Sequence, residues 1–98
     1  MRVISQDGTM DFPYEMSIVW CEDAGAVLLQ PIGETGEYQT FAKYSTEEKA
    51  KKAMEELRYA YMCHSLVKMG KSPLDGIGEK LTIGLGGVFQ FPTEEELE

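Results

Sequence analysis

The sequence has few of the residue types on which most catalytic and metal sites depend. It contains one histidine, two cysteines and one tryptophan among its 98 residues. Cys21 and Cys63 stand far apart and neither belongs to a C-x-x-C pair, so we expect buried free thiols rather than a disulfide scaffold or a zinc site. His64 follows Cys63 directly, but neighbours on a helix point about 100° apart, too far for a nucleophile and its base. We therefore predict no metal, no cofactor and no catalytic residues.

Basic residues are also scarce, which limits the partners that the chain can bind. Nine Lys and Arg stand against seventeen Asp and Glu, for a net charge of −8. A nucleic-acid polymer requires a basic stripe that releases counterions, so we do not expect one as a partner. A small anionic ligand requires only one or two well-placed cations. An acidic chain can also bind a basic host protein, and that alternative stays open.

Long hydrophobic runs are absent. No stretch of about 18 apolar residues occurs, which argues against a membrane-spanning helix and a membrane partner. The first residues lack the apolar core and cleavage site of a secretory signal, so we expect a cytoplasmic protein. An apolar fraction of 43% in 98 residues suffices for one core, and we predict a single domain over residues 1–98.

The first part of the chain, residues 1–44, reads as antiparallel strands joined by turns. The expected strands cover residues 3–6, 9–12, 17–21, 26–29 and 38–44. Asp7-Gly8 between the first two favours a type I′ hairpin, in which both central residues reach positive φ. Pro13 ends this pairing or leaves its strand at an edge. Alternation in the last strand would place Phe41 opposite Thr40 and Ala42.

A long helix is predicted over residues 45–69. Ser45 and Glu48 fit a capping box, and Gly70 is a natural stop. The first half has an ordinary apolar stripe that can lie on a sheet. The predicted fold class is therefore α+β: an antiparallel β-meander packed on one long α-helix.

The second half of this helix is apolar or nearly neutral around most of its circumference, over residues 59–67. Such a helix has to be buried on every side, and one small sheet cannot do this. We predict that a second copy covers it in a two-fold homodimer. The alternative, which stays open, is that the glycine-rich segment folds back over the helix.

Three further segments complete the chain: a Gly-rich loop (70–87), a short strand (88–91) and an acidic tail (92–98) that we expect to be disordered. The loop opens with Gly70-Lys71-Ser72, but a phosphate loop needs an earlier glycine and a following helix. Here the triplet follows a helix C-terminus, where free carbonyls repel anions. We expect a connector, or a loop that a ligand orders.

Arg58 is the candidate binding residue that the pattern favours. It lies where the charged half of the helix meets the apolar half, and a guanidinium can hold phosphate oxygens in bidentate fashion. An exposed ion pair with Glu55 is the other interpretation. Nearby side chains could stack on a base or donate hydrogen bonds, with core packing as the alternative for the aromatic ones. These candidates are Tyr61, His64, Lys68, Phe89 and Phe91.

Three segments, MRVISQDG…DFPYE, YSTEEKAKKAMEELR and VFQFPTEEELE, resemble small proteins of Firmicutes phages and prophages. The Lys-Ala-Met-x-x-Leu-Arg helix and the Phe-x-Phe-Pro end also resemble the first family of Thoeris anti-defence sponges. That resemblance implies a non-enzymatic oligomer that binds cyclic ADP-ribose-type signals or cyclic oligonucleotides between its subunits, with Arg58 at the position of the helix arginine. It suggests a phage protein that acts in the cytoplasm of a bacterial host cell and sequesters a cyclic nucleotide immune signal. The alternative function is an acidic inhibitor of a host nuclease or repressor.

Overall fold

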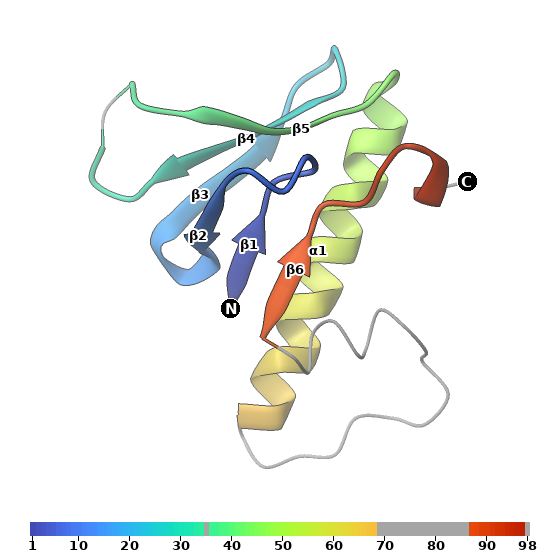
Figure 1. The fold of residues 1–98 in the computed structure, drawn as a ribbon. Coiled ribbons are helices and arrows are strands. Elements are labelled where there is room, and N and C mark those ends of the chain that lie inside the picture. Colours follow the sequence, from blue (N-terminus) through green and yellow to red (C-terminus); the bar gives the residue numbers. More distant parts are fainter. Residues whose placement is uncertain (35, 69–86, 98) are drawn as a thin grey trace.

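The described residues form one long helix and two three-stranded sheets, with two short 3-10 turns (Figure 1). The structure is a computed structural model, and it describes residues 1–34, 36–68 and 87–97. The α+β class is confirmed, because a three-stranded antiparallel meander and a second small sheet both pack against the helix. The expected loop at residues 70–86 lies outside the described residues.

The first sheet has the order β2-β1-β6 and is not purely antiparallel. It consists of β1 (Arg2–Ile4), β2 (Asp11–Pro13) and β6 (Val88–Gln90). β2 runs antiparallel to β1, but β6 runs parallel to it. The sequence had assigned no direction to this last strand. A parallel neighbour requires a long crossover, and the helix lies in the connection that brings β6 back beside β1.

The first hairpin forms as predicted, but with a different turn. The N–H of Ser5 donates to the carbonyl of Met10 at 2.8 Å, which joins the two arms. No residue other than glycine has a positive φ among those described, so Asp7 cannot occupy a type I′ turn. Within this turn only Gly8 takes the left-handed conformation, at φ 79°. The Asp7 carboxylate instead accepts hydrogen bonds from Thr9 and Ser5, which lower its pKa to about 2.

The second sheet is the predicted meander. β3 (Ser17–Cys21), β4 (Ala26–Pro31) and β5 (Gln39–Lys43) pair antiparallel in chain order. A bulge interrupts β5, because Val27 pairs with Ala42 while Leu28 pairs with Thr40. Phe41 is the extra residue, so Phe41 and Ala42 both point into the core and are 4% and 3% exposed. The predicted alternation is therefore wrong at Phe41.

The helix α1 spans Glu47–Lys68, which confirms the long helix. Its N-cap is Thr46, whose hydroxyl accepts from the N–H of Lys49 at 3.2 Å. The capping box predicted for Ser45 is wrong by one residue, because the N–H of Ser45 donates to the carboxylate of Glu94.

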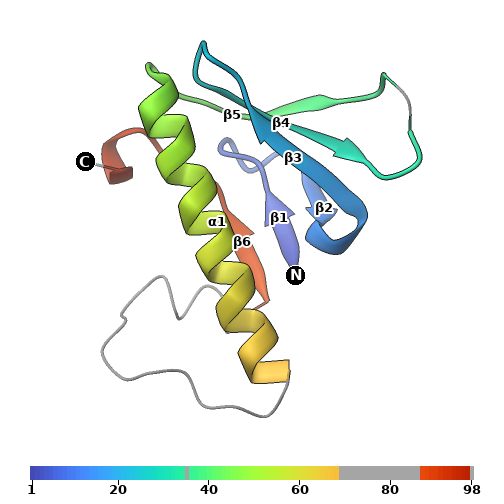
Figure 2. The ribbon, with the colours of Figure 1, turned by 180° about the vertical axis from the view of Figure 1, so that it is seen from behind.

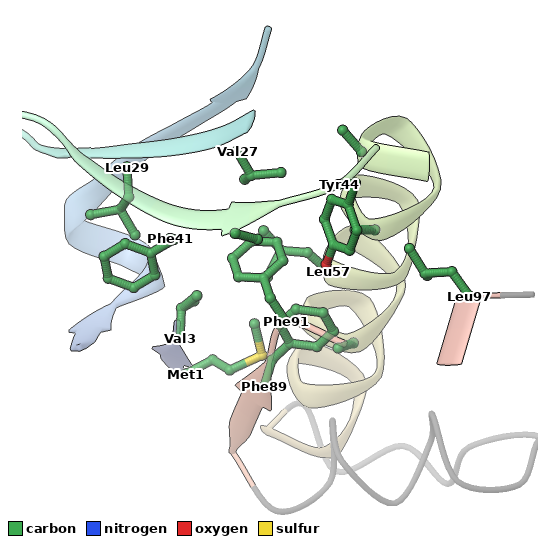
Figure 3. Close-up of a cluster of buried hydrophobic side chains, with 14 residues drawn as sticks. Met1, Val3, Val27, Leu29, Phe41, Tyr44, Leu57, Phe89, Phe91 and Leu97 are labelled. Atoms are coloured by element: carbon green, nitrogen blue, oxygen red, sulfur yellow. The ribbon is translucent and has the colours of Figure 1, made fainter. Parts of the chain in front are cut away.

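The buried side chains of both sheets meet one face of α1 in a single cluster (Figure 3). The helix presents small residues there, at the helical spacing that the sequence predicted, so that the sheets approach its backbone closely. Phe89 and Phe91 lie in the centre of this cluster with their rings 5.3 Å apart at 85°. The main contributors from α1 are Ala50, Ala53, Leu57 and Ala60.

The described part of the acidic tail, residues 92–97, is ordered, contrary to the prediction. Glu95–Leu97 form a 3-10 helix, η2, and Leu97 is only 3% exposed in the core cluster. Before this turn, the carbonyl of Pro92 accepts from the hydroxyl of Tyr44 at 2.7 Å and from the side chain of Gln6 at 3.2 Å. The tail therefore packs on the helix and the strands.

The second half of α1 is only partly buried by the described residues. Ala60 and Cys63 are 1% and 2% exposed, whereas Met62 is 50% exposed and Tyr59, Tyr61 and residues 64–66 are partly exposed. The segment offered as an alternative cover lies outside the described residues, so coverage by a second copy stays a prediction. Within the described part of the chain, no helix is both long and apolar enough to cross a bilayer.

Candidate functional site

A groove of about 450 Å³ lies between the helix and the edge of the meander. Three elements line it: η1 (Tyr14–Met16) at one end, β3 along one side and α1 along the other. The volume falls within the range of small-molecule sites, roughly 300–1,000 Å³. The lining residues are Tyr14, Glu15, Ser17, Val19, Met54, Arg58 and Tyr61. The groove therefore contains two of the candidates predicted from the sequence, Arg58 and Tyr61.

The helix contributes a stripe to the groove. Met54, Arg58 and Tyr61 follow i, i+4, i+7 spacing, which places them on one face of α1. Arg58 is exposed, and the ion pairs among the described residues do not include one with Glu55. No hydrogen bond or ion pair within the described residues engages the Arg58 guanidinium, so its donors are available to a ligand.

An aromatic pair borders the groove. The rings of Tyr14 and Tyr61 have centroids 4.7 Å apart and are tilted by 47°. The two residues come from η1 and α1, so their contact joins the walls of the groove at one end. Both side chains are partly exposed. A planar ligand could therefore stack on the accessible side of either ring while Arg58 holds its anionic group.

The groove also contains a carboxylate, Glu15, which opposes an anionic ligand. Its charge is compensated: the ammonium group of Met1 donates to both oxygens of Glu15 at 2.8 Å. The Met1 side chain is fully buried at this point. A compensated carboxylate repels an anion far less than a free one does. Arg58 is thus the dominant charge available to a ligand here.

The other predicted site residues do not join this groove. His64 lies one turn further along α1, 6.5 Å from Tyr61 between ring centroids, and its ring faces Gly87 at the start of β6. The side chain of Lys68 lies outside the described residues. Phe89 and Phe91 are 3% and 1% exposed, so the prediction that they stack on a ligand is wrong. Their rings pack in the core, the alternative that the sequence had left open.

Sequence reasoning missed Tyr14 and Glu15. Both belong to the short 3-10 turn η1 after Pro13, which was read only as the end of a pairing. The signal was present in part, because an exposed aromatic residue next to a predicted turn is a common binding residue. Its relation to Arg58 could not be seen, since it depends on how β3 packs against the helix.

A second group of charges lies at the far end of β3. The carboxylate of Glu47 forms an ion pair with Lys51 at 3.1 Å. Its hydrogen bond with Asp23 raises the pKa of Asp23, and the same bond lowers the pKa of Glu47. Asp23 is exposed and Glu47 is partly exposed, and the two carboxyl groups titrate as a pair. Among the described residues, no three His, Cys, Asp or Glu side chains are arranged to hold a metal ion.

Comparison of the chain with protein-family models, with curated proteins and with solved structures found no match. The resemblance to phage proteins therefore stays a prediction from sequence motifs. The candidate function has to be argued from the groove.

Proposed function

We propose that this chain is a non-enzymatic binding protein that sequesters a small anionic nucleotide in the groove beside Arg58. The observation that carries the proposal is the combination of an unengaged guanidinium with the Tyr14–Tyr61 pair in one groove. A nucleotide has the matching parts: phosphate oxygens for Arg58 and a base for an aromatic ring. Following the sequence motifs, the ligand class is a cyclic nucleotide immune signal, and its removal would inhibit host anti-phage defence.

Binding without turnover is favoured by what the groove contains. Its ionisable side chains are one arginine, one compensated carboxylate and two tyrosines. General acid–base chemistry near neutral pH needs a group that titrates there and reaches the substrate. His64, the residue type most suited to this, faces Gly87 instead of lining the groove. Arg58 can bind and orient a phosphate, but arginine is not a side chain that serves as a general acid or base.

Isothermal titration with a panel of cyclic ADP-ribose isomers and cyclic oligonucleotides tests the proposal, with inorganic phosphate as a reference anion. We expect at least one cyclic nucleotide to bind and to be released unchanged. Replacing Arg58 by Gln removes charged hydrogen bonds worth about 1.5–3 kcal/mol, so affinity should fall by about 10- to 150-fold. Tyr61→Leu should cost about 1–3 kcal/mol if this ring stacks on a base.

The chain's other arginine provides a matched control. Arg2 lies on β1, where its side chain donates to Asp11 at 2.8 Å, and it does not line the groove. Arg2→Gln changes the net charge by the same amount as Arg58→Gln and should leave affinity unchanged. The proposal is wrong if no nucleotide of the panel binds, or if Arg58→Gln and Arg2→Gln reduce the affinity equally. If no nucleotide binds and the chain instead captures a basic host protein in a salt-sensitive complex, the alternative function, an acidic inhibitor of a host nuclease or repressor, is favoured.

A further inference from the structure

The two sheets have four edges, and three of them are protected against pairing with another chain. β2 and β6 are only three residues long, and β2 ends in Pro13. The edge of β5 is occupied by Gln6, which donates its N–H to Phe41 at 2.7 Å and accepts from the N–H of Lys43 at 3.0 Å. Short strands, proline and covering segments are the usual protection of sheet edges. The fourth edge, β3, has none of these.

The outward groups of β3 can be identified from its pairing with β4. Met16 and Glu22, which flank β3, bond to Ile32 and Ala26 at 2.9 Å, so even-numbered residues direct their backbone groups toward β4. Odd-numbered residues, Val19 and Cys21 among them, direct theirs to the open side. Among the described residues, none is hydrogen-bonded to the outward N–H or C=O of Val19 or Cys21. In Figure 2, β3 is the strand at the front of its sheet.

The sequence of β3 favours pairing. Its five residues, Ser-Ile-Val-Trp-Cys, include no charge and no proline, and three of them have high β-propensity. On the outer face Ile18 is 50% exposed and lies two positions from the partly exposed Trp20. A strand with unpaired backbone groups and an apolar outer face is a template for another strand.

We propose that β3 pairs antiparallel with β3 of a second copy of this chain, about a two-fold axis at Val19, and that the two meanders form one continuous sheet. This register is self-complementary, because Val19 faces its own copy and Ser17 faces the partner's Cys21. It also sets each exposed Ile18 opposite the partner's Trp20, an aromatic and β-branched cross-strand pair that stabilises sheets. The N–H of Ser17 is bonded to the carbonyl of Tyr14, so the new bonds come from Val19, Cys21 and the carbonyl of Ser17.

Charge and size decide the strength of this dimer. The paired segment carries no charge, so the register opposes no like charges within it. Beyond its ends the register sets Glu15, whose charge the Met1 ammonium compensates, opposite the partner's Asp23, while Glu22 and Asp23 are exposed acids that oppose association. The net charge of −8 on each chain still opposes association, and added salt screens it. An interface of one strand pair is small, so we expect a micromolar dimer that tightens as salt increases.

Sedimentation velocity or light scattering between about 1 and 200 μM tests this directly, because weak interfaces dissociate in that range. We expect the mass to rise from 11.0 kDa toward twice that value. Val19→Pro removes an outward N–H at an edge position that tolerates proline, and should weaken the dimer at least about tenfold. Ile18→Lys leaves the backbone hydrogen-bonding groups of β3 unchanged and should also weaken the dimer. This variant therefore tests the interface even if Val19→Pro does not fold.

Two controls separate this interface from others. Ile32→Lys changes an equally exposed apolar residue just past the end of β4, and Met62→Lys changes the exposed residue in the predicted helix interface. Both should leave the dimer unchanged. A mass of 11.0 kDa throughout, an unchanged dimer in Ile18→Lys, or loss of the dimer only in Met62→Lys would each overturn the inference. None of these readouts depends on a nucleotide ligand, so the proposed function can fail independently.

Discussion

Replacing Gly25 by alanine is expected to destabilise this fold much more than the same change at Gly33. The two glycines have nearly the same backbone, with φ at 93° and 91°, in the turns before and after β4. Their surroundings differ. A Cβ on Gly25 would lie 2.3 Å from the carbonyl oxygen of Tyr44, whereas a Cβ on Gly33 meets nothing within 4 Å.

The magnitude follows from this difference. Positive φ costs alanine about 1–2 kcal/mol at both sites, partly offset by the reduced freedom of the unfolded chain. At Gly25 the Tyr44 carbonyl must also retreat by about 0.7 Å to reach a separation of 3.0 Å. That retreat strains the hydrogen bond from the N–H of Tyr44 to the carbonyl of Gly25, now 2.9 Å. We expect about 1 kcal/mol for Gly33→Ala and about 3–5 kcal/mol for Gly25→Ala.

Urea unfolding followed by circular dichroism measures both variants. With a slope of about 1–2 kcal/mol per molar, Gly25→Ala should lower the midpoint by about 1.5–5 M and Gly33→Ala by about 0.5–1 M. Equal shifts in the two variants would refute the reasoning, because only the contact with Tyr44 distinguishes the sites. A Gly25→Ala protein as stable as the wild type would show that the turn is not packed against Tyr44 in solution.

Three further changes test the packing of the tail and of the first hairpin. Leu97→Ala should cost about 2–3 kcal/mol in urea unfolding, since Leu97 is 3% exposed, whereas a disordered tail would cost nothing. Tyr44→Phe removes the hydroxyl that donates to the Pro92 carbonyl, and should cost about 0.5–1.5 kcal/mol without changing the unfolding slope. Asp7→Asn should reduce the dependence of stability on pH in acid. Because the folded pKa of Asp7 is about 2, below its ordinary value of 3.8, its contribution is complete above pH 4 and is lost as pH falls toward 2. If wild type and Asp7→Asn lose stability in parallel between pH 4 and 2, the hydrogen bonds to this carboxylate are not formed.

Local sequence signals predicted the elements of this fold better than their pairing. Ser17–Cys21 was located to the residue, because a β-branched and aromatic run between turn residues has few alternatives. The bulge at Phe41 could not be predicted in the same way, since it depends on how β5 fits the neighbouring strand. The cap at Thr46 was misplaced by one residue for a related reason. Glu94, distant in sequence, takes the N–H of Ser45 and leaves Thr46 to cap the helix.

The acidic tail was predicted to be disordered because its run of glutamates was given more weight than its single leucine. A run of glutamates indicates disorder, yet a single leucine at position 97 enters the core and the acids beside it find partners. The carboxylate of Glu94 accepts from Ser45 and lies 3.6 Å from the ammonium of Lys49, and Glu96 accepts from Thr93. For the site, helical spacing predicted that Arg58 and Tyr61 share a face. It could not show that Tyr14 closes the groove.

The two proposals can be tested against each other, because Ser17 and Val19 belong both to the groove and to the open edge of β3. A second copy paired with β3 would place its own Val19 side chain beside the groove. Ligand binding and dimerisation must then be linked, and the coupling has to be the same in both directions. A ligand that tightens the dimer would mean that the second copy adds a wall to the groove, and one that loosens it would mean that the second copy occupies the groove. A dimer whose dissociation constant is unaffected by a saturating ligand would show that the ligand does not bind beside Val19, even if each proposal had passed its own test.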